Sequence, residues 1–158
     1  MNHKLAAARN FFEKHQYQEA QKICDEILST GARNCNLLHL TANCCIQMNR
    51  LQEAKEFLHQ ASVYDPVNEI VWLDIGKVCS KLRTFEEGLE AYSNALEINP
   101  QSASALNGLA VITAHLGNTD LSAQHIELAY QIDPENSKIK SNREKILKIC
   151  NRRNSEMQ

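Results

Sequence analysis

The chain has 158 residues, of which 43% are hydrophobic and 23% are charged, and its formal net charge is −2. This composition is typical of a globular protein with a sizeable core and excludes a disordered chain, while a near-neutral charge gives no sign of nucleic-acid binding by the chain as a whole. Five Gly and three Pro are few, which favours long helices over a turn-rich β fold.

The N-terminal stretch 1–15 holds only a short, mildly apolar run, so it does not predict a secretory signal. No apolar run approaches the roughly 20 residues needed to span a bilayer. Six cysteines lie at positions 24, 35, 44, 45, 79 and 150, and no pair has CxxC spacing. We therefore expect reduced thiols and a cytoplasmic protein without a membrane span.

A proline-containing turn recurs at a fixed spacing along the chain. The stretches VYDPVN, EINPQS and QIDPEN each place a proline after Asp or Asn, at Pro66, Pro100 and Pro134. Aligning these prolines divides the chain into units 1–34, 35–68, 69–102 and 103–136. A constant period of this length is typical of repeat architectures. The first unit lacks the proline, and Gly31 in STGAR is expected to make its turn.

Each unit has the pattern of two helices. In the third unit Trp72, Ile75, Gly76 and Cys79 fall at i, i+3, i+4 and i+7, which is one face of a helix. Short polar turns at 49–50, 83–84 and 117–118 separate the two helices and predict antiparallel pairs. Small residues at the eighth, twentieth and twenty-seventh places of the units allow close helix packing. Because one such pair cannot bury its apolar face alone, the pairs are expected to stack.

The third unit resembles the tetratricopeptide repeat, whose pattern runs Trp, Leu-Gly, Tyr, Ala, aromatic, Ala and Pro. Those places here hold Trp72, Ile75, Gly76, Cys79, Gly88, Tyr92, Ala95 and Pro100. The second and fourth units follow the pattern, the first is weaker, and Cys or Thr replaces the usual Tyr in the last three units. The resemblance implies an all-α superhelix, a right-handed solenoid of antiparallel helix pairs, with residues 1–151 as a single array.

Residues 137–151 do not follow the repeat and are predicted to form a capping helix. Their apolar stripe is Ile139, Ile146, Leu147 and Cys150, and residues 152–158 are expected to be frayed. The segment 137–153 has seven Lys or Arg against one Glu, a net charge of +6, whereas residues 1–136 have 10 against 17, a net charge of −7. A basic helix of this kind is interpreted as a solvated cap, with contact to an acidic partner, RNA or a membrane surface as the alternative.

The sequence has no motif that carries catalytic chemistry. HExxH, GxSxG and glycine-rich phosphate loops are all missing. Cys35 and His39 lie four residues apart but have no second pair of metal ligands. Cys24, Cys45 and Cys79 occupy predicted core places, which leaves Cys35 and Cys44 as the candidates for a partly exposed, reactive thiol. We predict that the protein is not an enzyme and needs no cofactor or metal.

In tetratricopeptide arrays the first helix of each pair lines a concave groove, so the resemblance implies a binding face there. The residues at its groove places are Arg9, Phe12, Asn36, His39, Asn43, Gln47, Ile70, Leu73, Asp74, Lys77, Lys81, Asn107, Val111 and His115. Amide side chains can hydrogen-bond the backbone of an extended peptide, and the apolar members can accept its side chains. Packing of Leu73 between repeats is the alternative role for that residue.

Some arrays of the family grip the C-terminal carboxylate of Hsp70 or Hsp90 with a set of lysines and asparagines. Here the nearest register places Asp74 in that set, and Asp74 would repel a carboxylate. Where the clamp has its Lys and Arg, this sequence has Ser104 and Gly108. This carboxylate clamp is therefore not expected.

The leading hypothesis is a noncatalytic scaffold or adaptor that binds a peptide or protein segment in its concave groove. One alternative is a small chaperone of a secreted protein, of the type III secretion class. Another is the N-terminal docking domain of a larger enzyme such as a transferase. A homodimer is also open, because exposed apolar residues at array ends can mediate self-association.

Overall fold

The structure is a computed structural model that describes residues 2–156. Within that range the chain forms helices and no strands, as predicted. The elements are α1 (Asn2–Glu13), α2 (Tyr17–Ser29), α3 (Cys35–Gln47), α4 (Leu51–Tyr64), α5 (Glu69–Leu82), α6 (Phe85–Ile98), α7 (Ala103–His115), α8 (Thr119–Ile132) and α9 (Ser137–Glu156).

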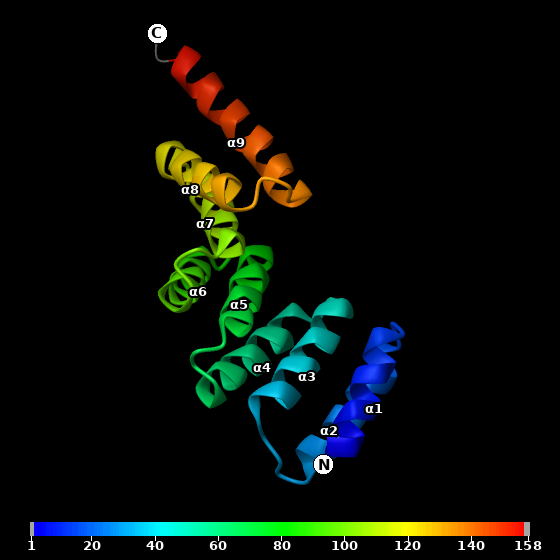
Figure 1. Cartoon of the computed structure of the whole chain (residues 1–158). Coiled ribbons are helices and arrows are strands. Elements are labelled where there is room, and N and C mark those ends of the chain that lie inside the picture. Colours follow the sequence, from blue (N-terminus) through cyan, green and yellow to red (C-terminus); the bar gives the residue numbers. More distant parts are fainter. Residues whose placement is uncertain (1, 157–158) are drawn as a thin grey trace.

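The helices pair in chain order, and each pair packs on the next. The array therefore runs from α1 and α2 at one end to α9 at the other (Figure 1). The first helices of successive pairs also touch, α1 with α3, α5 with α7 and α7 with α9. We call the side of the array formed by α1, α3, α5, α7 and α9 its inner face. The stacked antiparallel pairs confirm the predicted all-α superhelix.

The turn inside each pair has one backbone conformation, repeated every 34 residues. His15, Asn49, Arg83 and Gly117 all have positive φ, between 59° and 80°. In each turn the following residue donates its N–H to a carbonyl five residues back, as from Arg50 to Cys45 at 2.8 Å. This is the Schellman arrangement, which satisfies the last carbonyls of the first helix and reverses the chain. Three of the four positions are not glycine, so stacking of the pairs must offset the cost of the left-handed conformation.

The prolines end the second helices. Pro66, Pro100 and Pro134 each lie two residues after the last residue of α4, α6 and α8. Proline has no N–H to continue the hydrogen-bond ladder, so the chain leaves the helix there and enters the next pair. After α2 the turn instead uses Gly31, whose φ is +83°, which confirms the expectation for the first unit.

Small residues permit the close packing that the sequence predicts. Ala8, Ala42 and Ala110 have no exposed surface, and Gly76 at the equivalent place is also buried. Tyr92 of α6 lies against Gly76 and Gly108, where an added Cβ would come within 2.6 Å and 2.2 Å of its ring. A side chain at either glycine would displace the ring, so the two glycines let α5 and α7 close around one aromatic wedge.

The last helix packs on α8 and α7 through Ile139 and Ile146, which are 2% and 4% exposed. Cys150 packs against the same cluster. The helix continues to Glu156, so residues 152–156 of the expected frayed tail are helical, and residues 157 and 158 lie outside the described residues. The expected boundary at residue 151 thus falls inside α9.

Candidate functional site

A cavity of about 470 Å³ opens on the inner face of the array. Its walls come from α3, α5, α7 and α9, with one residue from α6. The lining residues are Asn43, Ile46, Gln47, Asp74, Lys77, Val78, Ser80, Lys81, Tyr92, Asn107, Gly108, Val111, Lys138 and Asn142. The cavity is thus built by the first helices of four successive parts of the array.

Half of the residues implied as a binding face meet at this cavity. They are Asn43, Gln47, Asp74, Lys77, Lys81, Asn107 and Val111. They lie on three helices and span 69 positions of sequence, from 43 to 111 inclusive. Only stacking of the pairs brings them together.

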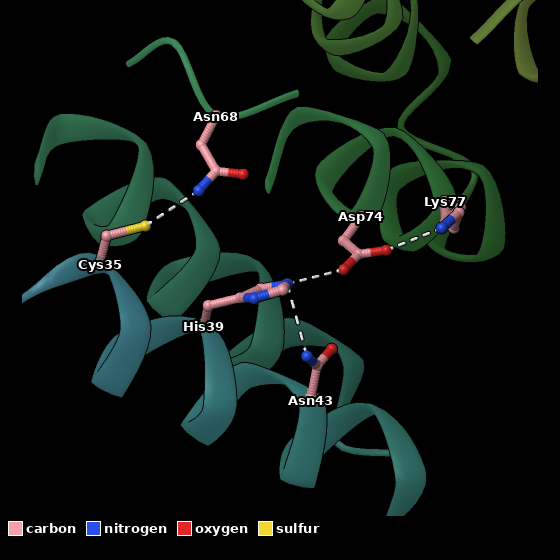
Figure 2. A network of polar contacts seen from close by, with 6 residues as sticks. All are labelled: Cys35, His39, Asn43, Asn68, Asp74 and Lys77. Atoms are coloured by element: carbon pink, nitrogen blue, oxygen red, sulfur yellow. Dashed lines mark hydrogen bonds and ion pairs between the residues drawn. The ribbon is translucent and has the colours of Figure 1, made fainter. Parts of the chain in front are cut away.

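A polar network joins α3 to α5 beside the cavity (Figure 2). His39 Nε2 lies 2.8 Å from Asp74 Oδ2, and Lys77 Nζ donates to Asp74 Oδ1 at 2.8 Å. Burial acts to raise the pKa of Asp74, but the hydrogen bonds from His39 and Lys77 outweigh it and hold that pKa below its usual value. The carboxylate is therefore ionised and already paired, and Lys77 is committed to it.

The amide of Asn43 is not committed in the same way. Its Nδ2 lies 3.4 Å from His39 Nε2. A carboxylate can only accept, so Nε2 must carry the hydrogen that is directed at Asp74 and has no lone pair for Asn43. The Asn43 amide consequently keeps its hydrogen-bonding capacity for another group at the cavity wall.

The last helix supplies part of the site. Asn142 of α9 donates through Nδ2 to Asn107 Oδ1 at 2.8 Å, and Asn107 is only 7% exposed. The sequence did not predict Lys138, Asn142 or Tyr92 as site residues. Lys138 and Asn142 lie in the helix that was expected to be only a cap, and Tyr92 was assigned to the repeat core. Continuing the 34-residue numbering past position 136 would have placed Lys138 and Asn142 at the second and sixth places, both of which face the groove in this family.

The other implied residues lie away from the first cavity. Arg9 and Asn36 are exposed at the N-terminal half of the array, and Ile70 is 59% exposed. Phe12 packs edge-on against Tyr17, with ring centroids 5.3 Å apart. These four are not brought together with the cavity residues.

Two further residues have packing partners of their own. Leu73 packs against the buried cluster around Tyr92, which is the alternative role considered for it. His115 stacks on Phe85, with centroids 5.5 Å apart and planes inclined by 11°.

A second cavity, of about 310 Å³, lies between α7 and α9. Its walls are Val111, Ala114, His115, Asn142, Lys145, Ile146 and Ile149. Val111 and Asn142 line both cavities, so the two hollows are adjacent.

One cysteine, Cys44, differs from what the sequence predicts. Cys44 was a candidate for a reactive thiol, but it is fully buried, and burial raises its pKa to about 12. That candidate is wrong, because a thiol of this kind is neither accessible nor ionised at neutral pH. Cys24, Cys45 and Cys79 are fully buried in the core, as predicted.

Cys35 is half-buried and accepts a hydrogen bond from Asn68 Nδ2 at 3.7 Å (Figure 2). Burial raises its pKa as well. Among the described residues no three His, Cys, Asp or Glu side chains are grouped so that they could hold a metal ion. Across residues 2–156, no helix has both the length and the apolar character that crossing a bilayer requires.

These features define a helical-repeat protein whose inner face carries the candidate site. The sequence model for the family described as anaphase-promoting complex, cyclosome, subunit 3 matches residues 13–95. The tetratricopeptide repeat model matches residues 73–137. The chain belongs to the tetratricopeptide repeat family.

Curated relatives resemble a large part of this chain. An N-terminal acetyltransferase A complex auxiliary subunit of Arabidopsis thaliana is 28% identical over 108 residues, which cover 66% of this chain and 12% of that protein. A human N-alpha-acetyltransferase 16, NatA auxiliary subunit, is 24% identical over 106 residues, covering 64% and 12%. The match therefore spans only about an eighth of the length of these relatives.

Solved structures share the fold. The crystal structure of YrrB, described as a tetratricopeptide repeat protein with an unusual peptide-binding site, superposes with a TM-score of 0.84 at 18% identity, covering 89% of this chain and 73% of that one. A chain of the anaphase-promoting complex hetero-tetramer Cut9–Hcn1 gives 0.81 at 14% identity, covering 91% and 29%. At these identities the likeness shows the fold alone.

Proposed function

We propose that this chain is a noncatalytic interaction module that holds an extended segment of a protein partner in the first cavity. The observation that carries the proposal is the convergence of seven implied groove residues from α3, α5 and α7 on one hollow. Amides of Asn43 and Gln47 lie at its wall, where they can hydrogen-bond the N–H and C=O groups of a partner backbone. The His39–Asp74 contact joins α3 to α5, and Asp74 also accepts from Lys77, so these charged groups are already paired and the amides are left to bind a partner.

The array suits this role because its site lies on packed helices. The four first helices that form the walls are held by the buried clusters behind them. A surface of this kind needs little rearrangement on binding, which lowers the entropic cost of association. The known role of tetratricopeptide repeats as protein-interaction scaffolds agrees with this proposal.

Site-directed photo-crosslinking tests the location of the partner. A crosslinking residue at position 47 or 111, at the cavity wall, is expected to capture a partner from an extract of the source cells. The same residue at position 90 of α6 or 124 of α8, both exposed and away from the cavity, serves as the matched control. If positions 90 and 124 capture the same partner as efficiently as 47 and 111, the partner does not occupy the groove.

A second candidate function follows from the relatives. Those named above are auxiliary subunits of an N-terminal acetyltransferase complex. This supports the docking alternative only in part: it favours a link to a transferase, but with the array as one section of an auxiliary subunit that holds a separate catalytic subunit, and not as the N-terminal domain of the enzyme itself. The chaperone alternative for secreted proteins stays a prediction without such support.

Co-expression tests the docking function directly. The chain, and a longer form if the open reading frame continues, is produced together with the N-terminal acetyltransferase catalytic subunit of the same organism. Co-elution on gel filtration is expected, with no acetyl transfer by the chain alone. Separate elution of the two proteins under conditions where the chain is folded by circular dichroism would remove this candidate.

A further inference from the structure

We propose that the two adjoining cavities recognise an acidic segment that carries a large apolar side chain next to its carboxylates. The carboxylates lie near Lys81 and Lys138, and the apolar side chain enters the cavity between α7 and α9. This inference rests on the proposed function, because it names the kind of peptide that the groove takes.

The charge of the first cavity is unbalanced. Its charged wall residues are Asp74, Lys77, Lys81 and Lys138. Asp74 is already paired with Lys77 and His39, so it offers nothing to the other two lysines. Lys81 and Lys138 have no ion-pair partner within the part of the chain that the structure describes. Two lysine ammonium groups that line the same cavity repel each other, and a carboxylate bound in that cavity would attract both of them.

The surrounding charge favours a short acidic segment over a nucleic acid. Residues 1–136 have a net charge of −7, so the remainder of the array repels a long polyanion. The basic helix α9 is also partly neutralised, since Lys140 pairs with Glu135 and Arg143 with Glu127. Lys81, Lys138 and Lys145 remain as cations at the cavity walls, which matches a few carboxylates on a peptide.

The neighbouring cavity provides the apolar half of the site. Val111, Ala114, Ile146 and Ile149 form most of its wall, and Ile149 is 47% exposed to solvent. Val111 also lines the first cavity, so a segment bound beside Lys81 and Lys138 passes directly to this hollow. Burial of an apolar side chain there removes both it and Ile149 from water, which favours binding by roughly 25 cal/mol per Å² of apolar surface.

The last helix is thereby part of the binding site and not only a cap. Lys138 contributes charge to the first cavity, Ile146 and Ile149 contribute apolar surface to the second, and Asn142 lies between. The hydrogen bond from Asn142 to Asn107 fixes α9 against α7 at the junction of the two hollows. Of the basic residues of this helix, Lys138 lines the first cavity and Lys145 lines the second.

The test is a selection from a random peptide library displayed inside a loop of a carrier protein, so that no peptide has a free terminal carboxylate. Selected sequences are expected to be enriched in Asp or Glu next to Leu, Ile or Phe. A representative peptide, acetylated and amidated, is then measured by fluorescence anisotropy. The double variant Lys81→Glu/Lys138→Glu is expected to weaken its binding by about tenfold or more.

Matched control variants distinguish an effect of charge at the cavity walls from an effect of the net charge of the protein. Lys14→Glu/Lys148→Glu makes the same change in net charge at exposed positions outside both cavities, and binding should stay within about twofold of wild type. A peptide whose acidic residues are changed to Lys should bind the Lys81→Glu/Lys138→Glu variant better than the original peptide does. Ile149→Ser should weaken binding, while Leu128→Ser on α8, equally exposed at 47%, should not.

The outcomes distinguish this inference from the proposed function. If the selected peptides are neutral or basic and lose binding to the Asn43→Ala/Gln47→Ala variant, the groove remains the binding site but the ligand is not an acidic segment. Selected peptides that are insensitive to every cavity substitution would overturn both. Binding of a random single-stranded RNA through Lys81 and Lys138, with no peptide selected, would overturn the inference in favour of a nucleic acid. Circular dichroism of each variant confirms that it is folded.

Discussion

The two outermost described helices, α1 and α9, differ in what they bury and in what they line. At the N-terminal end α1 buries Ala8 completely, while Leu5 and Phe12 are only partly covered. At the C-terminal end α9 buries Ile139 and Ile146 and also lines both cavities. Of these two outermost described helices, α9 therefore lines both cavities and α1 lines neither of the two.

The position of a helix in the array, and not the repeat pattern alone, thus decides whether its inner face lines the first cavity. Arg9 and Phe12 occupy groove places by sequence, as Asn107 and Val111 do. Asn107 and Val111 line the first cavity and Arg9 and Phe12 do not, because α7 is contacted by both α5 and α9. Among the described residues, α1 is contacted by α2 and α3, whereas α7 is contacted by α5, α6, α8 and α9.

The largest expected effect tests the anchoring of the two ends. Ile139→Ala should lower the free energy of unfolding by about 2–5 kcal/mol, because Ile139 is 2% exposed and its truncation leaves a cavity under α9. Leu5→Ala in α1 should cost less than about 2 kcal/mol, since Leu5 is only partly buried. Urea unfolding followed by circular dichroism measures both. Equal losses at the two positions would contradict the asymmetry of the ends.

The next effect compares equivalent places in two units. Gly108 and Ala6 both hold the sixth place, but only Gly108 faces Tyr92, where a Cβ would come within 2.2 Å of the ring. Gly108→Ala should destabilise the protein by about 1–3 kcal/mol through overpacking, although alanine is the better helix former. Ala6→Gly should cost about 0.5–1 kcal/mol, from helix propensity alone.

A second substitution checks the cause of the Gly108→Ala effect. Adding Tyr92→Leu should recover part of the loss, because the smaller side chain leaves room for the new Cβ. The thermal midpoint of each variant is the measurement. A Gly108→Ala variant as stable as wild type would show that Tyr92 moves aside without cost.

An intermediate effect concerns the network that joins α3 to α5, between the two ends. The pKa of Asp74 is lowered in the folded state, so its contribution to stability is complete above the ordinary aspartate pKa of about 3.9 and is lost as the pH falls through the lower, folded-state pKa. The stability difference between wild type and Asp74→Asn should therefore shrink below about pH 4. Urea midpoints between neutral and acidic pH measure it.

Lys77→Gln removes one of the two donors to Asp74 and serves as the companion variant. Its loss of stability at neutral pH should be smaller than that of Asp74→Asn, because the His39 hydrogen bond is kept. An Asp74→Asn difference that is constant over the whole pH range would mean that the carboxylate charge contributes nothing.

The smallest effects are expected at the exposed ion pairs of the two ends. Lys4 pairs with Glu26 near the N-terminus and Lys140 with Glu135 near the C-terminus, both at 3.1 Å and both well exposed. Lys4→Ala and Lys140→Ala should each change the unfolding free energy by no more than about 0.5–1 kcal/mol. A larger loss at Lys140 would show that α9 is held by charge as well as by apolar burial.

Much of the fold could be predicted because its signals are local. The prolines, Gly31 and the short polar turns mark helix ends through backbone chemistry that depends on a few neighbouring residues. The apolar periodicity likewise assigns Ile75 and Cys79 to the core, where both are buried. The candidate site was predicted only in part: Asn43 and Lys81 line the first cavity and His115 lines the second, whereas Phe12 packs on Tyr17 and lines neither.

Sequence patterns predict the period of 34 residues, the antiparallel pairing and the small residues that allow close packing, since each follows from bonding and sterics within one unit. Which inner-face residues share a cavity depends instead on how the helix pairs stack. Lys138 and Asn142 reach the cavity because α9 packs on α7, and Cys44 is buried because α3 is covered by its neighbours. Contacts between units depend on how whole helices stack, and no short stretch of sequence specifies that arrangement.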